Sequence, residues 1–401
     1  MLKIKDFEKA TSRLKGVLHK TPLERSNTFS AMAGCEVYLK YENLQKTGSF
    51  KLRGAYNKIS ELKEKGKTKS VVASSAGNHA QGVAFAASRL GMEATIVMPR
   101  TTPIAKINAT EEYGAKVVLS GYCYDDAYNK GKEICAETKA EFVHPFNDEA
   151  VIAGQGTLGN EILSALPNVD MVFVPAGGGG LLAGVAFYLK KINPRIKVIG
   201  VQAEGAAAIK KSFEKKKLTS LKTINTIADG IAVKTPGDIT FDLINEYVDD
   251  IVTVSDSEIS SAILNLLERC KQMVEPAGAS SLAAVLGGKV DVKGKRCVCL
   301  LTGGNIDVSF IHKIIDIGLV ARKRKLKFKT VMPDIPGSLE CFAKIMAENY
   351  ANIVMVQYDR MSADLDPHEV ILHIACEVGG EEHGNAVVKS LEKNCYKVIM
   401  E

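Results

Sequence analysis

Short apolar runs rich in β-branched residues recur along this chain, and they constrain its fold more than any other feature. Each run lacks the apolar–polar alternation of a half-exposed strand, and each is followed by a segment long enough for a helix. This pattern is typical of strands buried on both faces of a parallel sheet and joined by crossover helices. The sequence therefore predicts an α/β fold that binds ligands at the carboxyl ends of its strands. The runs are SVVASS (70–75), EATIVMP (93–99), AKVVLSG (115–121), EFVHPF (141–146), DMVFVPAG (170–177), KVIGVQAE (197–204), IVTVSD (251–256) and RCVCLLTGG (296–304).

The overall composition is that of a globular chain. Its 401 residues, 46% apolar and 24% charged, suit two or three domains. The net charge of +6 is concentrated in residues 210–218 and 321–329, without a nucleic-acid-binding motif, so no nucleic-acid partner is expected. No apolar run is long enough for a membrane span, and no secretion signal is recognisable. Together with nine irregularly spaced cysteines, these features predict a cytoplasmic protein with reduced thiols and no membrane association.

One polar stretch draws attention to a lysine. KTGSFKLRGA (46–55) places Lys51 at the start of a predicted helix, after the capping residues Thr47, Gly48 and Ser49. The positive end of a helix favours the neutral form of an amine, and a neutral amine attacks carbonyl groups to form a Schiff base. Lys51 is therefore a candidate for covalent catalysis, with a surface cap as the alternative.

Two loops that follow predicted strands have the composition of anion sites. The residues from Ser74 to His79 open a helix with hydroxyls, an amide and a glycine, so their backbone N–H groups suit a carboxylate, although plain N-capping is the alternative. The four glycines 177–180, between a buried strand and an apolar helix, form a nest of N–H groups suited to a phosphate. The same run also fits a dinucleotide-binding fingerprint, with Glu204 as the ribose-binding acid.

A third loop ends the last predicted strand of the parallel sheet. Thr302 stands there before Gly303 and Gly304, so a neutral hydroxyl is available to a ring nitrogen and the glycines allow close backbone approach. A lysine, a carboxylate nest, a phosphate nest and this hydroxyl are together the set that pyridoxal phosphate requires. The sequence therefore predicts that Lys51 anchors pyridoxal 5′-phosphate.

In order and spacing, GSFKLRGA, SAGNHAQG, GGGGL and TGGN resemble the motifs of the fold-type-II pyridoxal-phosphate enzymes, and within them the threonine dehydratases, over about residues 1–320. The resemblance implies two sheet domains of the tryptophan synthase β type. It also implies that Lys51 holds the cofactor in a Schiff base and later acts as the base at the substrate's Cα. The implied cofactor contacts are Phe50 against the ring, Asn78 to the 3′-oxygen, Gly177, Gly178, Gly179, Gly180 and Leu181 to the phosphate, and Thr302 to the pyridine nitrogen. The implied substrate-carboxylate site is Ser75, Ala76 and Gly77.

Three positions depart from relatives of this family. Many relatives have serine where this chain has Thr302, which keeps the hydroxyl but restricts χ1. The related serine racemases have a serine at the position of Ala76 that protonates the opposite face of Cα, so racemisation is disfavoured here. The same relatives bind a divalent ion with a carboxylate where this chain aligns Lys210, and an ammonium opposes metal binding. No metal is expected.

The residues after 329 form a separate pattern. Their order of strand, helix, strand, strand, helix, strand is ferredoxin-like, and the turn around Pro336 and Gly337, with Asn352 opening the next strand, resembles an ACT regulatory domain. Relatives carry glycine where Tyr350 stands, and Asn349 is the alternative left-handed residue. The resemblance implies pairing between subunits and an amino-acid effector, isoleucine or valine, because the product of threonine dehydration leads towards isoleucine. A purely oligomerising domain is the alternative.

The sequence thus predicts a catalytic domain (1–320, with a small subdomain at about 48–150), a basic linker (321–329) and an ACT domain (330–401). The predicted reaction converts L-threonine, and also L-serine, to a 2-oxo acid and ammonia in a homodimer or homotetramer. An L-serine dehydratase or serine racemase of the same fold is the first alternative. A nicotinamide dehydrogenase based on the dinucleotide fingerprint is the more distant one.

Overall fold

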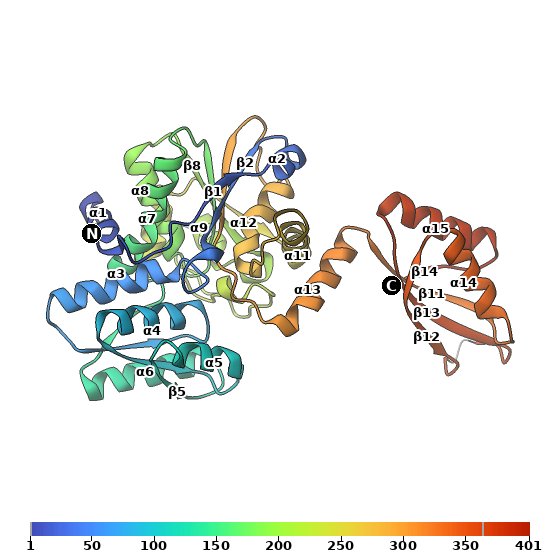
Figure 1. Cartoon of the computed structure of the whole chain (residues 1–401), viewed down its shortest axis with the longest axis horizontal. Coiled ribbons are helices and arrows are strands. Elements are labelled where there is room, and N and C mark those ends of the chain that lie inside the picture. The colour runs from blue at the N-terminus through green and yellow to red at the C-terminus, as the bar shows by residue number, and fades with distance from the viewer. Residues whose placement is uncertain (1, 363–364) are drawn as a thin grey trace. The chain divides into compact units, whose positions relative to one another are not determined.

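Three sheets organise residues 2–362 and 365–401, the residues that the computed structural model describes (Figure 1). The chain divides into two compact units, Met1–Asp307 and Val308–Glu401. The first unit holds a six-stranded sheet and a four-stranded parallel sheet with helices between the strands, which confirms the predicted α/β fold. The second unit holds an antiparallel sheet with helices.

The six-stranded sheet forms the larger half of the first unit. All neighbouring strands pair in parallel except the antiparallel pair β1 and β2. The run MVFVP of β7 is buried at every position, as expected for a strand with both faces covered. The sequence pattern predicts β7, β8, β9 and β10 but not the antiparallel pair β1 and β2. The strand order is β1 (Leu23–Arg25), β2 (Glu36–Tyr41), β10 (Arg296–Leu301), β7 (Met171–Pro175), β8 (Lys197–Ala203) and β9 (Asp250–Val254).

The four-stranded parallel sheet lies within residues 70–142, inside the segment predicted as a small subdomain. Its strand order is β5 (Lys116–Leu119), β4 (Glu93–Met98), β3 (Ser70–Ser74) and β6 (Glu141–Phe142). The helices of this region are α3 (Lys51–Glu64), α4 (Asn78–Leu90), α5 (Ile104–Glu111) and α6 (Tyr124–Thr138). Because α3 and α4 begin directly after the predicted lysine and carboxylate loops, both loops lie at helix N-termini.

Close packing of α7 (Glu149–Ala165) on α8 (Gly180–Ile192) supports the loop between β7 and α8. A Cβ on Gly184 would lie 2.4 Å from the carbonyl oxygen of Ile152, so only glycine lets the two helix backbones approach this closely. The ring of Phe7, on α1 (Ile4–Leu14), stacks on Phe187 of α8 with centroids 5.1 Å apart. The glycines 177–180 therefore precede a helix, α8, that is tightly packed against α7 and α1.

The remaining elements of the first unit complete the layers around the larger sheet. The α-helices are α2 (Asn27–Ala33), α9 (Ala208–Lys215), α10 (Asp238–Tyr247), α11 (Asp256–Asn265) and α12 (Pro276–Leu286). The short helical turns are η1 (Glu42–Leu44), η2 (Glu204–Ala206), η3 (Asp229–Ile231) and the π-helical η4 (Leu266–Cys270).

A buried ion cluster ties α3 to the larger sheet. The side chains of Arg53 and Glu42 are both fully buried, and Arg53 Nε and Nη2 donate to the two Glu42 oxygens at 2.8 Å each. Arg53 Nη1 also donates to Glu161 Oε1 on α7 at 2.6 Å, and Lys40 Nζ on β2 donates to Glu161 Oε2 at 2.6 Å. The pKa of Glu161 is lowered, because these cations outweigh the opposing effect of burial. The cluster fixes α3 two residues after Lys51.

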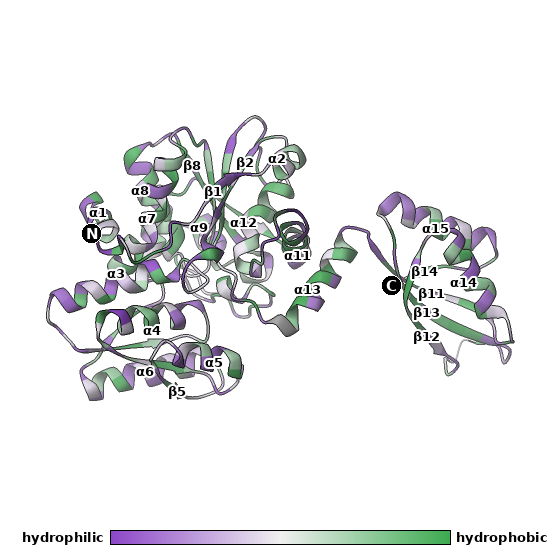
Figure 2. Ribbon diagram, viewed as in Figure 1, coloured by the Kyte–Doolittle hydropathy of each residue, from purple (hydrophilic) through white to green (hydrophobic). Residues whose placement is uncertain are grey.

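The second unit contains α13 (Val308–Ala321), β11 (Lys325–Pro333), α14 (Ser338–Glu348), β12 (Asn352–Asp359), β13 (Glu369–Glu377), α15 (Glu381–Lys393) and β14 (Ile399–Met400). From β11 onward this is the element order expected from the sequence, in a sheet ordered β12-β13-β11-β14. Figure 2 shows apolar residues along its strands, and Phe328 and Phe342 pack in its core with centroids 6.5 Å apart. Residues 325–329, expected in a basic linker, instead belong to β11, and only 322–324 separate α13 from that strand.

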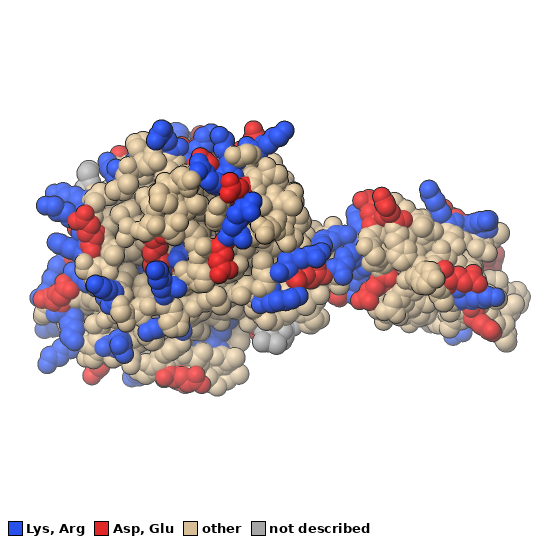
Figure 3. Space-filling model, turned by 45° about the horizontal axis from the view of Figure 1, so that its top comes forward, with Lys and Arg blue, Asp and Glu red and all other residues tan. Residues whose placement is uncertain are grey.

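Charged side chains of both signs are interspersed over the face of the first unit seen in Figure 3. In that view the positive charge does not form one continuous basic surface. Within residues 2–362 and 365–401, no helix has the length and apolarity that crossing a bilayer requires.

Candidate active site

The lysine loop and the Thr302 loop lie against each other. Ser49 forms an antiparallel bridge with Gly303, and the N–H of Phe50 donates to the Thr302 carbonyl at 3.1 Å. Lys51 follows as the first residue of α3, while Thr302 comes directly after β10 and is buried. Two motifs about 250 residues apart in sequence are thus brought together by backbone pairing.

The side chain of Lys51 is partly buried. Its Nζ donates to the carbonyl oxygen of Pro145 at 3.0 Å and lies 5.4 Å from the ring centroid of Phe50. Burial of the amine lowers the pKa of Lys51 from 10.5 to about 8, and the nearby Glu275 carboxylate opposes this shift. The direction is the one expected from the sequence, but its main cause is desolvation and not the helix end. A larger fraction of the amine is therefore neutral near physiological pH.

The glycine cradle, Gly177–Gly180, fills the turn between β7 and α8. A Cβ on Gly178 would lie 2.3 Å from the Phe146 ring, and one on Gly177 would lie 2.9 Å from the Cα of Ile231. Gly179 has a left-handed φ of +97°, which favours glycine. The last glycine opens α8, and Leu181 follows it in the first turn, so backbone N–H groups gather at the positive end of a helix. This is the geometry of a phosphate site.

The predicted carboxylate loop leads into α4. Ser75 Oγ accepts the N–H of Gly77 at 3.2 Å, and Ala76 lies between them. Asn78 begins α4, where the first backbone N–H groups of a helix have no partner within the helix. The neighbouring His79 is buried, with Nε2 2.9 Å from the Val143 carbonyl, and burial and Lys51 lower its pKa to about 3. His79 is therefore neutral and packs inside the first unit.

Glu275 is a site residue that the sequence reasoning missed. The Asn78 Nδ2 lies 2.9 and 3.0 Å from its two carboxylate oxygens, and the Glu275 N–H donates to the Gly303 carbonyl at 2.9 Å. Burial raises the pKa of Glu275 from 4.5 to about 7. Its only sequence signal is a charged residue directly before Pro276 and a long stretch of small and apolar residues, which also fits an ordinary helix start.

These residues fit pyridoxal phosphate. Asn78 Oδ1 and Ser49 Oγ are buried and lack a hydrogen-bond partner among the described residues, so both can bond an added polar group. The glycine cradle offers N–H groups to a phosphate, and the Lys51 amine can react with an aldehyde. The structure thus brings together Lys51, Phe50, Asn78, Thr302 and the residues of their loops.

The predicted regulatory residues lie apart from one another. β11 and β12 both pair antiparallel with β13, so they run parallel, and Lys325 and Asn352 share the partner Glu377. Asn352 therefore lies level with the start of β11. Pro336 and Gly337 follow the other end of that strand, after Pro333. Within one chain, these residues occupy opposite ends of the sheet.

Lys210, aligned with a metal ligand of relatives, has protein partners of its own. Its Nζ donates to the Ile251 carbonyl at 3.0 Å and pairs with Glu214 at 2.9 Å. In the described part of the chain, no three His, Cys, Asp or Glu side chains are grouped as a metal site would require. The expected absence of a metal stays a prediction.

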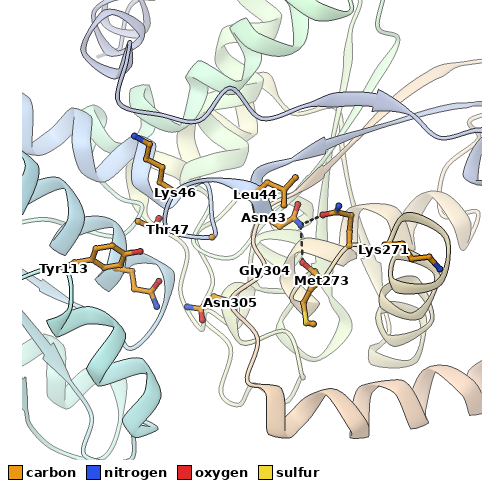
Figure 4. A pocket seen from close by; sticks show the side chains of 12 residues that line it. Asn43, Leu44, Lys46, Thr47, Tyr113, Lys271, Met273, Gly304 and Asn305 are labelled. Carbon is orange, nitrogen blue, oxygen red and sulfur yellow. Dashed lines mark hydrogen bonds between the residues drawn. The ribbon is translucent and has the colours of Figure 1, made fainter.

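A cavity of about 520 Å³ lies behind the lysine loop (Figure 4). Gly48 and Gly304, joined by a 2.9 Å backbone hydrogen bond, form part of its lining. Asn43 Nδ2 donates across its wall to Gln272 Oε1 at 3.1 Å and to the Met273 carbonyl at 3.2 Å. The cavity therefore borders the lysine loop and the Thr302 loop, although neither Lys51 nor the glycine cradle is among the residues that line it.

Comparison with known proteins agrees with this geometry. Residues 14–303 match the family model described as "Pyridoxal-phosphate dependent enzyme". The chain is 47% identical over 398 residues to an L-threonine ammonia-lyase from Thermotoga maritima, covering 99% of each protein. The structure of processed threonine deaminase isoform 2 from Solanum lycopersicum matches with a TM-score of 0.76 and 38% identity, over 79% of this chain and 88% of that one. Maize serine racemase matches with a TM-score of 0.74 and 35% identity, over 79% and 98%. These similarities, together with the lysine loop and the glycine cradle of this chain, establish that the chain belongs to the family of pyridoxal-phosphate dependent enzymes.

Proposed function

We propose that this enzyme converts L-threonine to 2-oxobutanoate and ammonia, and that it also acts on L-serine. The observation that carries the proposal is the desolvated Lys51 amine, held against the Pro145 carbonyl and lowered in pKa to about 8. The similarity to an L-threonine ammonia-lyase over nearly the whole of both chains supports this reaction within the family.

The proposed roles follow from the position of each residue. The glycine cradle and Leu181 would hold the cofactor phosphate, Phe50 would pack on the ring, and Asn78 and Thr302 would bond its polar atoms. Pyridoxal phosphate, when bound, accepts the electron pair that remains when the substrate's Cα loses a proton. Lys51 would take that proton, because its lowered pKa leaves a usable fraction of neutral amine.

Two side chains favour elimination over the alternatives. Thr302 offers a neutral hydroxyl, which does not keep a pyridine nitrogen protonated as a carboxylate does, and this suits loss of a β-hydroxyl better than transamination. Ala76, between Ser75 and Gly77 in the proposed carboxylate site, has no proton to give to the opposite face of Cα. We therefore prefer ammonia-lyase chemistry to racemisation.

We expect the purified enzyme to carry a visible cofactor absorbance band and to form 2-oxobutanoate and ammonia from L-threonine. The 2-oxo acid is measured by its reaction with a hydrazine reagent, and L-serine is tested in parallel. Formation of D-serine as the main product would instead identify a serine racemase. A nicotinamide signal without the visible band would support the dehydrogenase alternative and contradict the proposal.

The compartment and domain roles are part of the same proposal. We assign residues 1–320 to catalysis and 330–401 to an ACT regulatory domain. We place the enzyme in the cytoplasm, where thiols stay reduced, since all nine cysteines are free in the described structure.

We further propose that a second copy of the chain completes the effector site. β12 is an edge strand whose outer side is unpaired in the described chain, with Val354, Met355 and Tyr358 partly exposed. Such an edge is a template for another strand. Antiparallel pairing of two β12 strands about a two-fold axis would bring Asn352 of the second copy to the same end of the sheet as the Pro336–Gly337 turn, because β11 and β12 run parallel. A homodimer or homotetramer follows.

The side chains around this turn suit an apolar amino acid. Ile335 and Leu339 flank Pro336 and Gly337 and are exposed by 62% and 37%. The backbone groups of the turn and the amide of Asn352 suit the effector's ammonium and carboxylate. Isoleucine or valine is the proposed effector.

We expect Gly337→Asp to abolish the response of activity to isoleucine or valine while basal turnover persists. Gly337 has a φ of +92°, so an aspartate strains the turn, and its charge repels the effector carboxylate. Gly288→Asp is the matched control, because Gly288 also has positive φ and open space in the described structure but lies in the first unit. A Gly337→Asp enzyme that responds normally would mean that the effector does not bind at this turn.

A further inference from the structure

Glu275 joins three loops of the candidate site. Its backbone N–H bonds the Gly303 carbonyl, its carboxylate bonds Asn78, and its Oε1 lies 3.4 Å from where a Cβ on Gly230 would be. A Cβ on Gly303 would meet the same oxygen at 2.5 Å, so the surrounding backbone is fitted closely around the carboxylate. The residue is only 4% exposed, and its side chain does not cap α12. A buried carboxylate in this position calls for a role other than stability.

The amide of Asn78 has two different sides, and Glu275 occupies one of them. An ionised carboxylate only accepts hydrogen bonds, so it binds the NH₂ group and leaves Oδ1 facing away. This matches the structure, in which Nδ2 contacts both Glu275 oxygens and Oδ1 has no partner in the described chain. A protonated Glu275 can instead donate to Oδ1, which turns the NH₂ group outward.

We propose that Glu275 is a positioning residue whose protonation decides whether Asn78 turns the acceptor or the donor side of its amide towards the cofactor. The inference rests on the proposed contact between Asn78 and the 3′-oxygen of pyridoxal phosphate. That oxygen accepts hydrogen bonds when ionised, so protonation of Glu275 strengthens its contact with Asn78. The electronic state of the bound cofactor, and hence its absorbance, then depends on a proton held outside the cofactor.

Charged groups on several elements face this carboxylate. Burial is the main cause that raises the pKa of Glu275 to about 7, and Asp229 on η3 raises it further. Asn78 on α4, Lys106 on α5 and the Asn305 N–H lower it, and the Lys51 amine on α3 interacts with the same carboxylate. Asp229 and Lys106 pair with each other at 3.4 Å and are 70% and 21% exposed, so both can be changed without disturbing the core.

The test is a pH titration of the visible absorbance of the holoenzyme without substrate. We expect a transition near pH 7 in the wild type and its loss in Glu275→Gln, because an amide does not titrate. Asp229→Asn should move the midpoint down and Lys106→Met should move it up, each by less than about one unit because both charges are partly solvated. Opposite shifts are the expected effect of these two charges on a titrating group near them, and loss of the transition in Glu275→Gln identifies that group as Glu275. Lys130→Met, which removes a surface lysine paired with Glu133, is the control expected to leave the midpoint unchanged.

A second measurement uses the apoenzyme. The raised pKa means that wild-type stability falls as pH rises from about 4.5 to about 7, because the folded protein holds the proton more tightly than the unfolded chain. Glu275→Gln should not lose stability in this way. The difference between the thermal midpoint of the variant and that of the wild type should therefore increase as the pH rises from about 4.5 to about 7.

The possible outcomes separate this inference from the proposed function. A protein that binds no pyridoxal phosphate would overturn both. A loaded enzyme whose Glu275→Gln variant keeps the wild-type transition, or in which Asp229→Asn and Lys106→Met shift the midpoint in the same direction, would overturn the role of Glu275 alone. If Glu275→Gln does not fold, Glu275→Asp, which keeps a carboxyl of lower ordinary pKa, should move the midpoint down, and an unchanged midpoint would overturn the role.

Discussion

Replacing Lys51 with alanine is expected to lower the turnover of L-threonine by at least about 10³-fold, since a positioned acid–base group alone contributes about 10²–10⁴-fold. The visible absorbance band should disappear as well, because the covalent attachment is lost. Lys63→Ala, an exposed lysine on the same helix, is the matched control and should retain both properties. Steady-state assays and absorbance spectra of the two variants provide the measurement, and substantial turnover by Lys51→Ala would end the assignment.

The lowered pKa of Lys51 also predicts how the stability of the apoenzyme changes with pH, in the opposite direction to the change expected from Glu275. Its pKa is lowered from 10.5 to about 8, so below pH 8 the folded apoenzyme holds a desolvated ammonium that the unfolded chain solvates freely. Wild-type stability should therefore rise as pH increases from about 8 to about 10.5. Lys51→Met apoenzyme should be more stable than the wild type at neutral pH, with the difference narrowing across that window. Denaturation of both apoenzymes as a function of pH tests this, and a destabilised Lys51→Met would show that the ammonium is well solvated.

Arg53→Met is expected to destabilise the first unit by about 3–5 kcal/mol, because it leaves the fully buried Glu42 carboxylate without its partner. The Arg13→Met control removes another arginine paired with a glutamate of α3, but Glu64 is 55% exposed. An exposed pair contributes about 0–1 kcal/mol, so this control should have little effect.

Urea denaturation of the two variants gives the comparison, and adding Glu42→Gln to Arg53→Met should recover part of the loss. Equal midpoints for Arg53→Met and Arg13→Met would mean that water or another cation reaches Glu42. Arg53→Met should also weaken cofactor binding, because the cluster holds the helix that begins with Lys51.

The sequence pattern predicts the parallel strands well because burial on both faces removes alternation from runs such as MVFVP in β7. The pair β1 and β2 escapes prediction for a related reason. β1 has only three residues, and β2 contains the buried Lys40, whose ammonium is paired with Glu161. A lysine in a core strand is not recognisable until its distant partner is known.

The site residues also divide into those that the sequence predicts and those that it does not. Lys51, the glycine cradle and Thr302 are predictable because their chemistry lies in short contiguous motifs. Glu275 is not, because its contact with Asn78 joins residues 197 positions apart. The Pro145 carbonyl that holds the lysine is equally invisible, since any residue has such a group. The basis of the Lys51 pKa also needs the folded protein, because desolvation depends on what surrounds the amine.

The distance between the proposed regulatory residues is a further feature that the sequence does not predict. Pro336, Gly337 and Asn352 are close in sequence, yet the register of β11, β12 and β13 separates them. Sequence order alone carries no register, so distances along a sheet have to come from the strand pairing.

The close contact of Phe146 with Gly178 means that substitutions at these two positions depend on each other, both in evolution and in protein engineering. Any side chain at residue 178 collides first with that ring, and Gly180 faces the backbone of the same residue. A side chain at position 178 is therefore accommodated only after residue 146 has become smaller, whereas a smaller residue 146 does not remove the backbone contact of position 180. Libraries aimed at a bulkier phosphate-bearing cofactor analogue should accordingly vary Phe146 and Gly178 together, and keep both in the same gene segment when variants are recombined.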